Sequence, residues 1–261
     1  MNDKRRVSLF FFILVMIFFY LPILTLLVLS FNASKSLNWG GFSLKWYLEL
    51  FTKSPELWQT FFRSVFIAVT SSAVSVAIAT FGAIGIKWYN SVAKNYVKFI
   101  SYLPLVIPDI IMGISLAIFF NSLGQFGVEL NLGTVFIAHT TFNVPFVLFI
   151  ILSRLDEFDY SVVEAARDLG ASEIQALLSV IIPMMMPGII SGFLMAMTLS
   201  FDDYVITSFV TGVGSTTLPV HIYSMIRRGV SPVVNALSII LILGTIVLSL
   251  SSRKLQKYIF N

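Results

Sequence analysis

The chain has 261 residues, of which 57% are hydrophobic and only 11% are charged, and its formal net charge is +4. Soluble domains carry about 25% charged residues, so this composition indicates a polytopic membrane protein. The sequence contains no cysteine, which excludes disulfide bonds, thiolate metal sites and cysteine nucleophiles. It contains no GxxxxGK[ST] phosphate loop either, so the chain has no visible means of binding ATP by itself.

Six segments are long and apolar enough to cross a hydrocarbon core of roughly 30 Å, which takes about 20 apolar residues. They are residues 7–31, 62–86, 99–121, 132–153, 187–210 and 233–251. The first is longer than the apolar region of a cleavable signal peptide, and we expect it to be a retained helix. The sequence therefore predicts an all-α membrane protein whose residues 1–261 form a single transmembrane domain.

The basic residues predict the orientation of these spans. An even number of spans places both termini on one side of the membrane. If that side is cytoplasmic, most of the 17 Lys and Arg residues fall inside, as the positive-inside rule requires. Residues 154–186 are then the longest cytoplasmic connection.

This cytoplasmic connection predicts two short helices. Ser161 is expected to cap the first helix, with Glu164 as its partner in a capping box, and Gly170 suits the left-handed residue at its end. Ser172 opens the second helix, which Pro183 is expected to end. Such a pair of helices could dock into a groove of a partner or rest as an amphipathic linker on the bilayer surface.

The same connection carries a pattern with long and fixed spacing. Its parts are Glu164-Ala165-Ala166, three residues, Gly170, nine residues, and Val180-x-Ile182-Pro183. This pattern resembles the EAA motif of bacterial ABC-importer permeases, with conservative departures at Val180 and Ile182. The stretches NWGGFSLKWYLEL, IPDIIMGISL and LSFDDYVITSFVTG further resemble the permease subunits of spermidine/putrescine importers, and the resemblance covers nearly the whole chain.

The resemblance implies a type I ABC-importer (MetI-like) permease fold with cytoplasmic coupling helices, located in the bacterial cytoplasmic membrane. It implies a second permease subunit, two ATP-binding subunits and an external polyamine-binding protein as partners, and neither a cofactor nor nucleic acid. The residues that would couple the permease to the ATPase are Glu164, Ala165, Ala166, Asp168, Gly170, Glu173 and Pro183.

Three acids lie within the predicted spans: Asp109, Asp202 and Asp203. A charge at the bilayer centre costs about 2.5–3.5 kcal/mol by insertion scales. Lys and Arg residues lie only at the ends of the predicted spans, so they offer no ion pair. The acids must be protonated, hydrated in a cavity, paired with a partner subunit or paired with a cationic substrate. Asp109, which follows two prolines, could also cap a broken helix.

Small residues recur at every fourth position of the fifth span: Gly188, Gly192, Ala196 and Ser200. Such a stripe lets another helix approach closely. At about 100° per residue, Asp203 falls in the middle of the stripe and is expected to point into the protein. Asp202 lies about 100° away, on a flank that could line a cavity.

A path lined with acids suits a polyamine, which is a flexible chain of ammonium groups. Trp46 and Tyr47 could add cation–π attraction at the outer mouth of the path, or they could belong to an interfacial aromatic belt. Ser200 could hydrogen-bond beside the acids. The predicted substrate-pathway residues are therefore Asp109, Asp202, Asp203, Trp46, Tyr47 and Ser200.

The two histidines, His139 and His221, are not spaced as a ligand pair, and we expect hydrogen-bonded packing residues rather than metal ligands or proton relays. A proton-coupled secondary carrier would explain the acids but not the EAA pattern. An ABC permease for another small solute would explain both. The sequence contains neither an HExxH motif nor a serine–histidine constellation, so it gives no sign of an enzyme. The sequence thus predicts a permease subunit of an ATP-driven polyamine importer.

Overall fold

A computed structural model describes the backbone of residues 2–88, 94–229 and 231–259, and the side chains of residues 7–87, 95–229 and 231–247. Across these residues every regular element is a helix, and the single β pairing is an isolated antiparallel bridge between Asn32 and Phe42. The predicted all-α fold class is therefore confirmed. The orientation predicted from the basic residues places Arg253, Lys254 and Lys257 on the inside, and their side chains lie outside the described residues.

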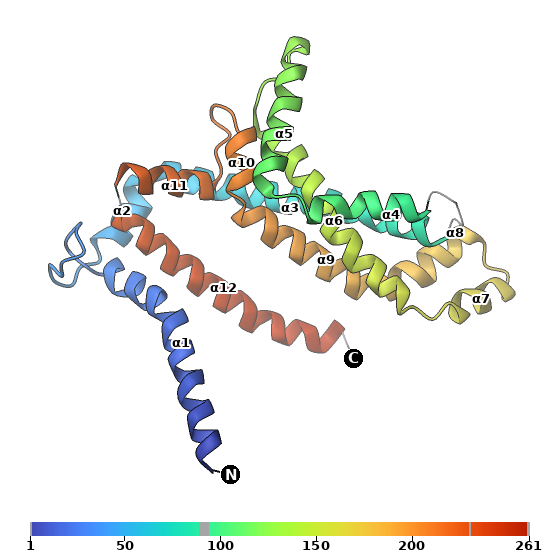
Figure 1. The fold of residues 1–261 in the computed structure, drawn as a ribbon, viewed down its shortest axis with the longest axis horizontal. Helices are drawn as coiled ribbons and strands as arrows, with labels where there is room; N and C mark the ends of the chain where they lie inside the picture. The colour runs from blue at the N-terminus through green and yellow to red at the C-terminus, as the bar shows by residue number, and fades with distance from the viewer. Residues whose placement is uncertain (1, 89–93, 230, 260–261) are drawn as a thin grey trace. The chain divides into compact units, whose positions relative to one another are not determined.

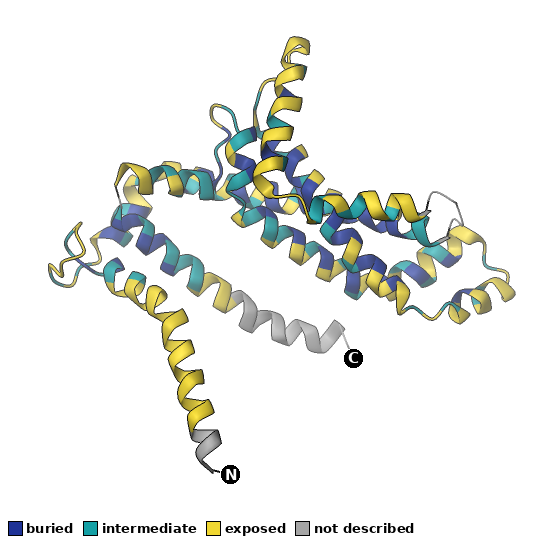
Figure 2. Ribbon diagram, in the orientation of Figure 1, coloured by how far each residue is buried: buried dark blue, intermediate teal, exposed yellow. Residues whose placement is uncertain are grey.

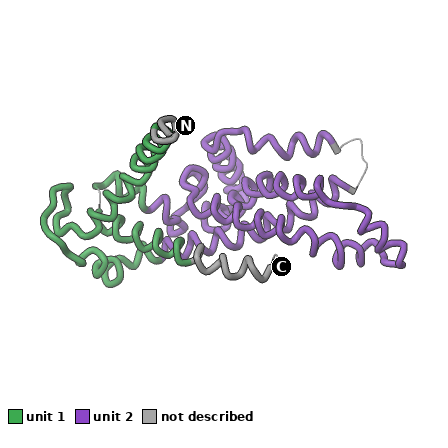
Figure 3. The backbone as a smooth tube through the Cα atoms, turned by 90° about the horizontal axis from the view of Figure 1, so that it is seen from below, with its two compact units in different colours: residues 1–58, 222–261 green, residues 59–221 purple. Residues whose placement is uncertain are grey.

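The chain forms two compact units, which Figure 3 shows in different colours. Unit 1 comprises residues 1–58 and 222–261, and unit 2 comprises residues 59–221. The helices of unit 1 are α1 (Asn2–Ser30), α2 (Lys45–Lys53) and α12 (Pro232–Ile259). Within unit 1, α12 contacts both α1 and α2. Helix α1 is apolar on all sides and exposed along its described length (Figure 2), which suits contact with lipid or with a partner helix.

Unit 2 holds the remaining helices, two of which extend across its boundary. They are α3 (Pro55–Trp88), α4 (Lys94–Tyr102), α5 (Asp109–Ser122), α6 (Leu132–Asp156), α7 (Ser161–Asp168), α8 (Glu173–Ala176), α9 (Ile182–Asp202), α10 (Val205–Val210) and α11 (Leu218–Arg228). Figure 1 labels these α-helices. The 3₁₀ turns η1 (Leu103–Leu105) and η2 (Leu123–Phe126) flank α5, and the π-helical turn η3 (Leu177–Ile181) joins α8 to α9.

Five described helical stretches are long and apolar enough to cross a membrane. They are Val7–Ser30, Pro55–Lys87, Asp109–Phe126, Leu132–Asp156 and Glu173–Asp202. The sixth predicted span, residues 233–251, lies in α12, whose apolar stretch is described over Pro232–Val247.

Two of the predicted spans are divided in the structure. The segment 99–121 breaks after the η1 turn, and α5 begins only at Asp109, because Pro104 and Pro108 each remove a backbone donor. The segment 187–210 breaks after α9, where Asp203 takes an extended backbone conformation with ψ of 122°. Both breaks place an acid at a helix end.

The second cytoplasmic helix does not end at Pro183, as the sequence predicted. Pro183 lies in the first turn of α9, and the helical path runs on from α8 through η3. The π-helical turn just before the proline widens the backbone there, which leaves room for the proline ring and lets the helical path continue. The coupling segment and the fifth span therefore share one helical rod from Glu173 to Asp202.

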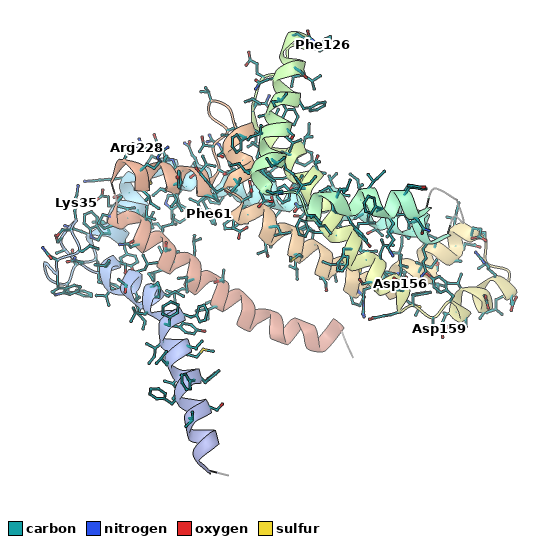
Figure 4. All side chains as sticks on the ribbon, viewed as in Figure 1. Lys35, Phe61, Phe126, Asp156, Asp159 and Arg228 are labelled. Atoms are coloured by element: carbon teal, nitrogen blue, oxygen red, sulfur yellow. The ribbon has the colours of Figure 1, made fainter. Side chains whose placement is uncertain are left out.

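Of the three residues predicted to cap the two short helices, Ser172 and Gly170 are confirmed and Ser161 is not. Ser172 does cap α8, and its capping box is closed by Gln175. Gly170 has the predicted left-handed backbone, with φ of 86°. Ser161, however, is the first residue of α7 rather than its cap. The carboxylate of Asp159 (Figure 4) accepts a hydrogen bond from the Ser161 N–H at 3.0 Å, and hydrogen bonds from the Ser161 hydroxyl and N–H hold the pKa of Asp159 below its usual value.

The predicted stripe of small residues is buried and faces α6. Gly188 lies against the side chain of Arg154, and Gly192 lies against Val147. Close approach of α6 and α9 buries a cluster that also includes side chains of α3 and of the cytoplasmic helices. Its central members are Val76, Ala79, Val147, Ile151, Leu155, Val163, Ile181 and Ala196. This cluster holds α7, α8 and η3 against the long helices α3, α6 and α9.

The α6–α9 contact predicts different costs for two glycine substitutions. A Cβ at position 192 would lie 2.9 Å from the Cγ1 of Val147, which is fully buried, so Gly192→Ala should lower stability by about 1–3 kcal/mol. A Cβ at position 188 would lie 2.9 Å from the Cγ and 3.3 Å from the Cβ of Arg154; the half-exposed side chain can move its Cγ away, and the Cβ contact needs a shift of only a few tenths of an ångström. Gly188→Ala is therefore the matched control. Thermal unfolding in detergent should show a lower midpoint for the first variant alone, and equal midpoints would contradict this packing.

Candidate functional site

The three acids predicted for the substrate pathway line one cavity of about 260 Å³ in unit 2. Two phenylalanines and a tyrosine form aromatic walls beside them. The lining residues are Asp109, Phe142, Phe146, Leu199, Asp202, Asp203, Tyr204, Val205 and Ile206. The cavity thus combines carboxylates with aromatic rings, which is a combination that attracts organic cations.

The two helix breaks bring the acids together. Asp109 is the first residue of α5, with Pro108 as the N-cap, and Asp202 is the last residue of α9. Helix α5 packs directly on α10, because Gly113 has no side chain that would hold the two helices apart. A Cβ on Gly113 would lie 2.6 Å from the Phe209 ring. The start of α5 therefore meets the α9–α10 connection, and the side chains of Asp109 and Asp202 are exposed there.

Asp203 has a different environment from the other two acids. Its side chain is only 9% exposed. Its carboxylate accepts hydrogen bonds from the N–H groups of Ile206 (3.3 Å) and Thr207 (2.8 Å) and from the Thr207 hydroxyl (2.6 Å). It therefore satisfies backbone donors at the start of α10, as an N-capping side chain does. The prediction that Asp203 points into the protein is confirmed, although it lies in the connection and not on a continuous helix.

His139 supplies the partner for Asp203 that the sequence did not reveal. Its Nε2 lies 3.5 Å from Asp203 Oδ2 and 2.8 Å from Thr207 Oγ1, and its Nδ1 lies 2.6 Å from Ser200 Oγ. The prediction that His139 is a hydrogen-bonded packing residue is confirmed. The prediction considered only Lys and Arg as partners for the acids and therefore missed this contact, which is an ion pair only when the ring is protonated. A polar ring in the middle of an apolar span was the available signal.

The other predicted pathway residues lie elsewhere. Ser200 is buried behind the cavity, where it contacts His139 and the hydroxyl of Ser71. Trp46 is buried in unit 1, and its indole N–H donates to the carbonyl of Asn32 at 2.6 Å. Tyr47, also in unit 1, has its hydroxyl 2.8 Å from Ser30 Oγ. Their proposed contact with a substrate stays a prediction.

Six of the predicted coupling residues lie on α7, on α8 or in the turn between them, and the seventh, Pro183, lies in the first turn of α9. Residues of α7 and the following turn are largely exposed, and so are the apolar side chains of Leu169, Ile174 and Leu178. An ion pair of 2.7 Å joins Arg167 to Glu173 across the turn at Gly170 and ties α7 to α8. The segment therefore presents a preformed, partly apolar surface.

A small hollow lies beside this surface. It has a volume of about 200 Å³ and is lined by Lys87, Tyr160, Val163, Glu164 and Arg167. Lys87 forms an ion pair of 2.6 Å with Asp156 (Figure 4), which links the end of α3 to the end of α6. Burial raises the pKa of the Tyr160 phenol, which lies under the Lys87 ammonium group. Among the described residues, no group of three or more side chains could hold a metal ion.

Comparison with known proteins decides the family. The profile of the family "Binding-protein-dependent transport system inner membrane component" matches residues 76–260. The chain belongs to this family. It is 39% identical to the spermidine/putrescine transport system permease protein PotC of Escherichia coli K12 over 241 residues, which cover 92% of this chain and 90% of that protein.

Two solved structures share the fold. A bacterial ABC transporter involved in the import of the acidic polysaccharide alginate matches with a TM-score of 0.72 at 17% identity, covering 97% of this chain and 98% of that one. The MetNI methionine ABC transporter matches with a TM-score of 0.65 at 16% identity, covering 80% and 99%. The predicted type I importer fold is thus confirmed.

The permease is a multi-pass protein of the inner membrane and one subunit of an ABC importer. As a member of this family it is not itself an ATPase, because a separate subunit hydrolyses ATP, and a binding protein delivers the substrate. This excludes the alternative of a proton-coupled secondary carrier.

The hydrogen bonds of Asp203 predict a difference between its two simplest substitutions. Asp203→Ala leaves the N–H groups of Ile206 and Thr207 without their acceptor, and should cost about 0.5–2 kcal/mol of stability. Asp203→Asn keeps an amide oxygen in the same place and should retain most of the stability. Thermal unfolding of the purified permease complex measures both. Equal losses in the two variants would show that the carboxylate does not cap α10.

Proposed function

We propose that this permease forms, with a second permease subunit, the membrane pathway for polyamines of the spermidine and putrescine type. The single observation that carries the proposal is the gathering of Asp109, Asp202 and Asp203 around one cavity with aromatic walls. Ammonium groups a few methylenes apart can each meet a carboxylate, and the methylenes between them can pack on the rings. An importer of another small organic cation is the alternative with the same chemistry.

The fold by itself does not select the substrate. Its neighbours include a transporter of an acidic polysaccharide and a transporter of methionine. Selection must therefore come from side chains in the pathway or from the binding protein. Three carboxylates on one cavity oppose an anionic substrate, and the relative named for spermidine and putrescine supports a polyamine.

Within the cavity the acids have different tasks. Asp109 and Asp202 are exposed and can exchange partners during transport. Asp203 is held by α10 and by His139, so it acts as a fixed negative charge. Trp46, Tyr47 and Ser200 do not line this cavity; they are proposed as further contributors to the path, Ser200 through its hydrogen bond to His139.

The cytoplasmic segment is proposed to dock into the ATPase subunit. The proposed contacts are Glu164, Ala165, Ala166, Asp168, Gly170, Glu173 and Pro183. The exposure of Leu169 and Ile174 supports this role, because large apolar side chains on a surface mark an interaction site. It follows that both termini are cytoplasmic. The exposed apolar surfaces of α1 and α5 suit lipid and the second permease.

The absence of native cysteine gives a direct test of the cavity. A single Val205→Cys substitution places a thiol among the acids, and Val213→Cys, at a fully exposed position of the same unit, is the matched control. In the assembled importer in lipid nanodiscs, a cationic methanethiosulfonate should react faster than an anionic one at position 205 only. Adding Asp202→Asn should lower this preference by roughly threefold, and polyamine uptake should fall as well. If the preference for the cationic reagent is the same with and without Asp202→Asn, the cation pathway is refuted.

The coupling role predicts a contrast between two glutamates of one loop. Glu164→Lys should abolish co-purification with the ATPase subunit and uptake, because it reverses a charge on the docking surface. Glu157→Lys alters an equally exposed residue whose ion pair with Arg154 contributes little to stability. Its co-purification should stay at the level of the unmodified complex. Loss of assembly in both variants, or in neither, would place the ATPase elsewhere.

A further inference from the structure

A row of hydrogen bonds crosses the core of unit 2 and ends on Asp203. It joins Ser71 Oγ to Ser200 Oγ (3.2 Å), Ser200 Oγ to His139 Nδ1 (2.6 Å) and His139 Nε2 to Thr207 Oγ1 (2.8 Å). Its last step is the 2.6 Å bond from Thr207 Oγ1 to Asp203 Oδ2. Four helices, α3, α6, α9 and α10, and the connection between α9 and α10 contribute to this row, and its side chains are almost entirely buried.

The chemistry of each group fixes the direction of the row. An ionised carboxylate only accepts hydrogen bonds, so Thr207 gives its one hydroxyl proton to Asp203. The Thr207 oxygen must then accept from His139, which places a proton on Nε2. In a neutral ring Nδ1 is consequently an acceptor, and Ser200 donates to it. Every donor in the row points towards Asp203.

The same heavy atoms also accommodate a charged His139. An imidazolium ring donates from both nitrogens, so Ser200 would turn its proton away from Nδ1 and towards the Ser71 oxygen, which is a rotation of hydroxyl hydrogens alone. The ring nitrogen at 3.5 Å from Asp203 Oδ2 would then form an ion pair. Because the two side chains are 1% and 9% exposed, water would screen this pair only weakly.

We propose that His139 sets how much negative charge Asp203 presents to the cavity. With a neutral ring, Asp203 keeps its full charge for an ammonium group of the passenger. With a charged ring, His139 acts as an internal cation that competes with the passenger. This inference rests on the proposed cation pathway and adds to it a residue that tunes its selectivity without lining the cavity.

The groups around His139 leave Asp203 as its nearest charged partner among the described residues. The connection between α9 and α10 contributes Asp203 itself, while α9 and α5 contribute Asp202 and Asp109 at the cavity wall. Tyr204 also lines the cavity. Helices α3, α9 and α10 contribute the hydroxyl groups of the row. Imidazole side chains change charge between about pH 5 and pH 8, so pH is the variable with which the proposal is tested.

The experiment follows the charge of the cavity with pH. The Val205→Cys importer in nanodiscs is labelled with the cationic and the anionic methanethiosulfonate, and mass spectrometry of this chain gives the ratio of the two rates. The thiolate fraction affects both rates equally and cancels in the ratio. From about pH 8 to about pH 5.5 the preference for the cationic reagent should fall by roughly threefold. Adding His139→Gln, which keeps an amide donor near Thr207 but cannot gain charge, should remove this fall.

Each outcome has a separate meaning. If the preference for the cationic reagent falls equally between pH 8 and pH 5.5 with and without His139→Gln, the proposal for His139 is overturned. This holds even where the preference at pH 8 still depends on Asp202. If Asp202→Asn does not change the preference at pH 8, the cation pathway is refuted instead. If His139→Gln does not assemble, His139→Asn serves, because its shorter amide keeps the acceptor for Ser200 and is also uncharged. Val213→Cys must show a constant ratio throughout.

Discussion

The close contact between α6 and α9 is the constraint on which the rest of unit 2 depends. Glycine, alanine and serine at every fourth position of α9 let the two backbones approach, so that Gly192 meets Val147. The same approach brings Ser200 to within hydrogen-bond distance of His139. Bulky side chains in the stripe would separate the two helices, and the buried ring would lose its partner. The packing of apolar residues thus determines the position of the polar ones.

The cavity depends on two places where helices stop. Prolines before α5 and the extended backbone at Asp203 interrupt segments that would otherwise run on as helices. Each interruption frees backbone groups, and interrupted backbone is tolerated at membrane depth only where protein or a water-filled cavity surrounds it. Here Asp203 satisfies the donors at the start of α10. The same side chain therefore completes a helix end and charges a cavity.

The sequence predicted what depends on local pattern and missed what depends on contacts between distant segments. Apolar length located the spans, and four-residue spacing located the face of α9 that meets α6. The pairing of His139 with Asp203 joins residues 64 positions apart on different helices, and no local pattern carries that information. The angle of 100° per residue was applied as if residues 187–210 formed one helix. The break at Asp203, where the side chain bonds to the start of α10, was therefore not foreseen. Pro183 was misjudged since one π-helical turn can absorb a proline.

The uninterrupted rod from Glu173 to Asp202 has a mechanical consequence. Its 30 residues span about 45 Å at 1.5 Å per residue, with the segment proposed to dock into the ATPase at one end and a cavity carboxylate at the other. A tilt of about 5° at the base moves the far end by about 4 Å, which is comparable to the diameter of an ammonium group with its contacts. If the proposed docking is right, a small movement of the docked end would thereby shift the cavity carboxylate far enough to change its contact with a bound cation.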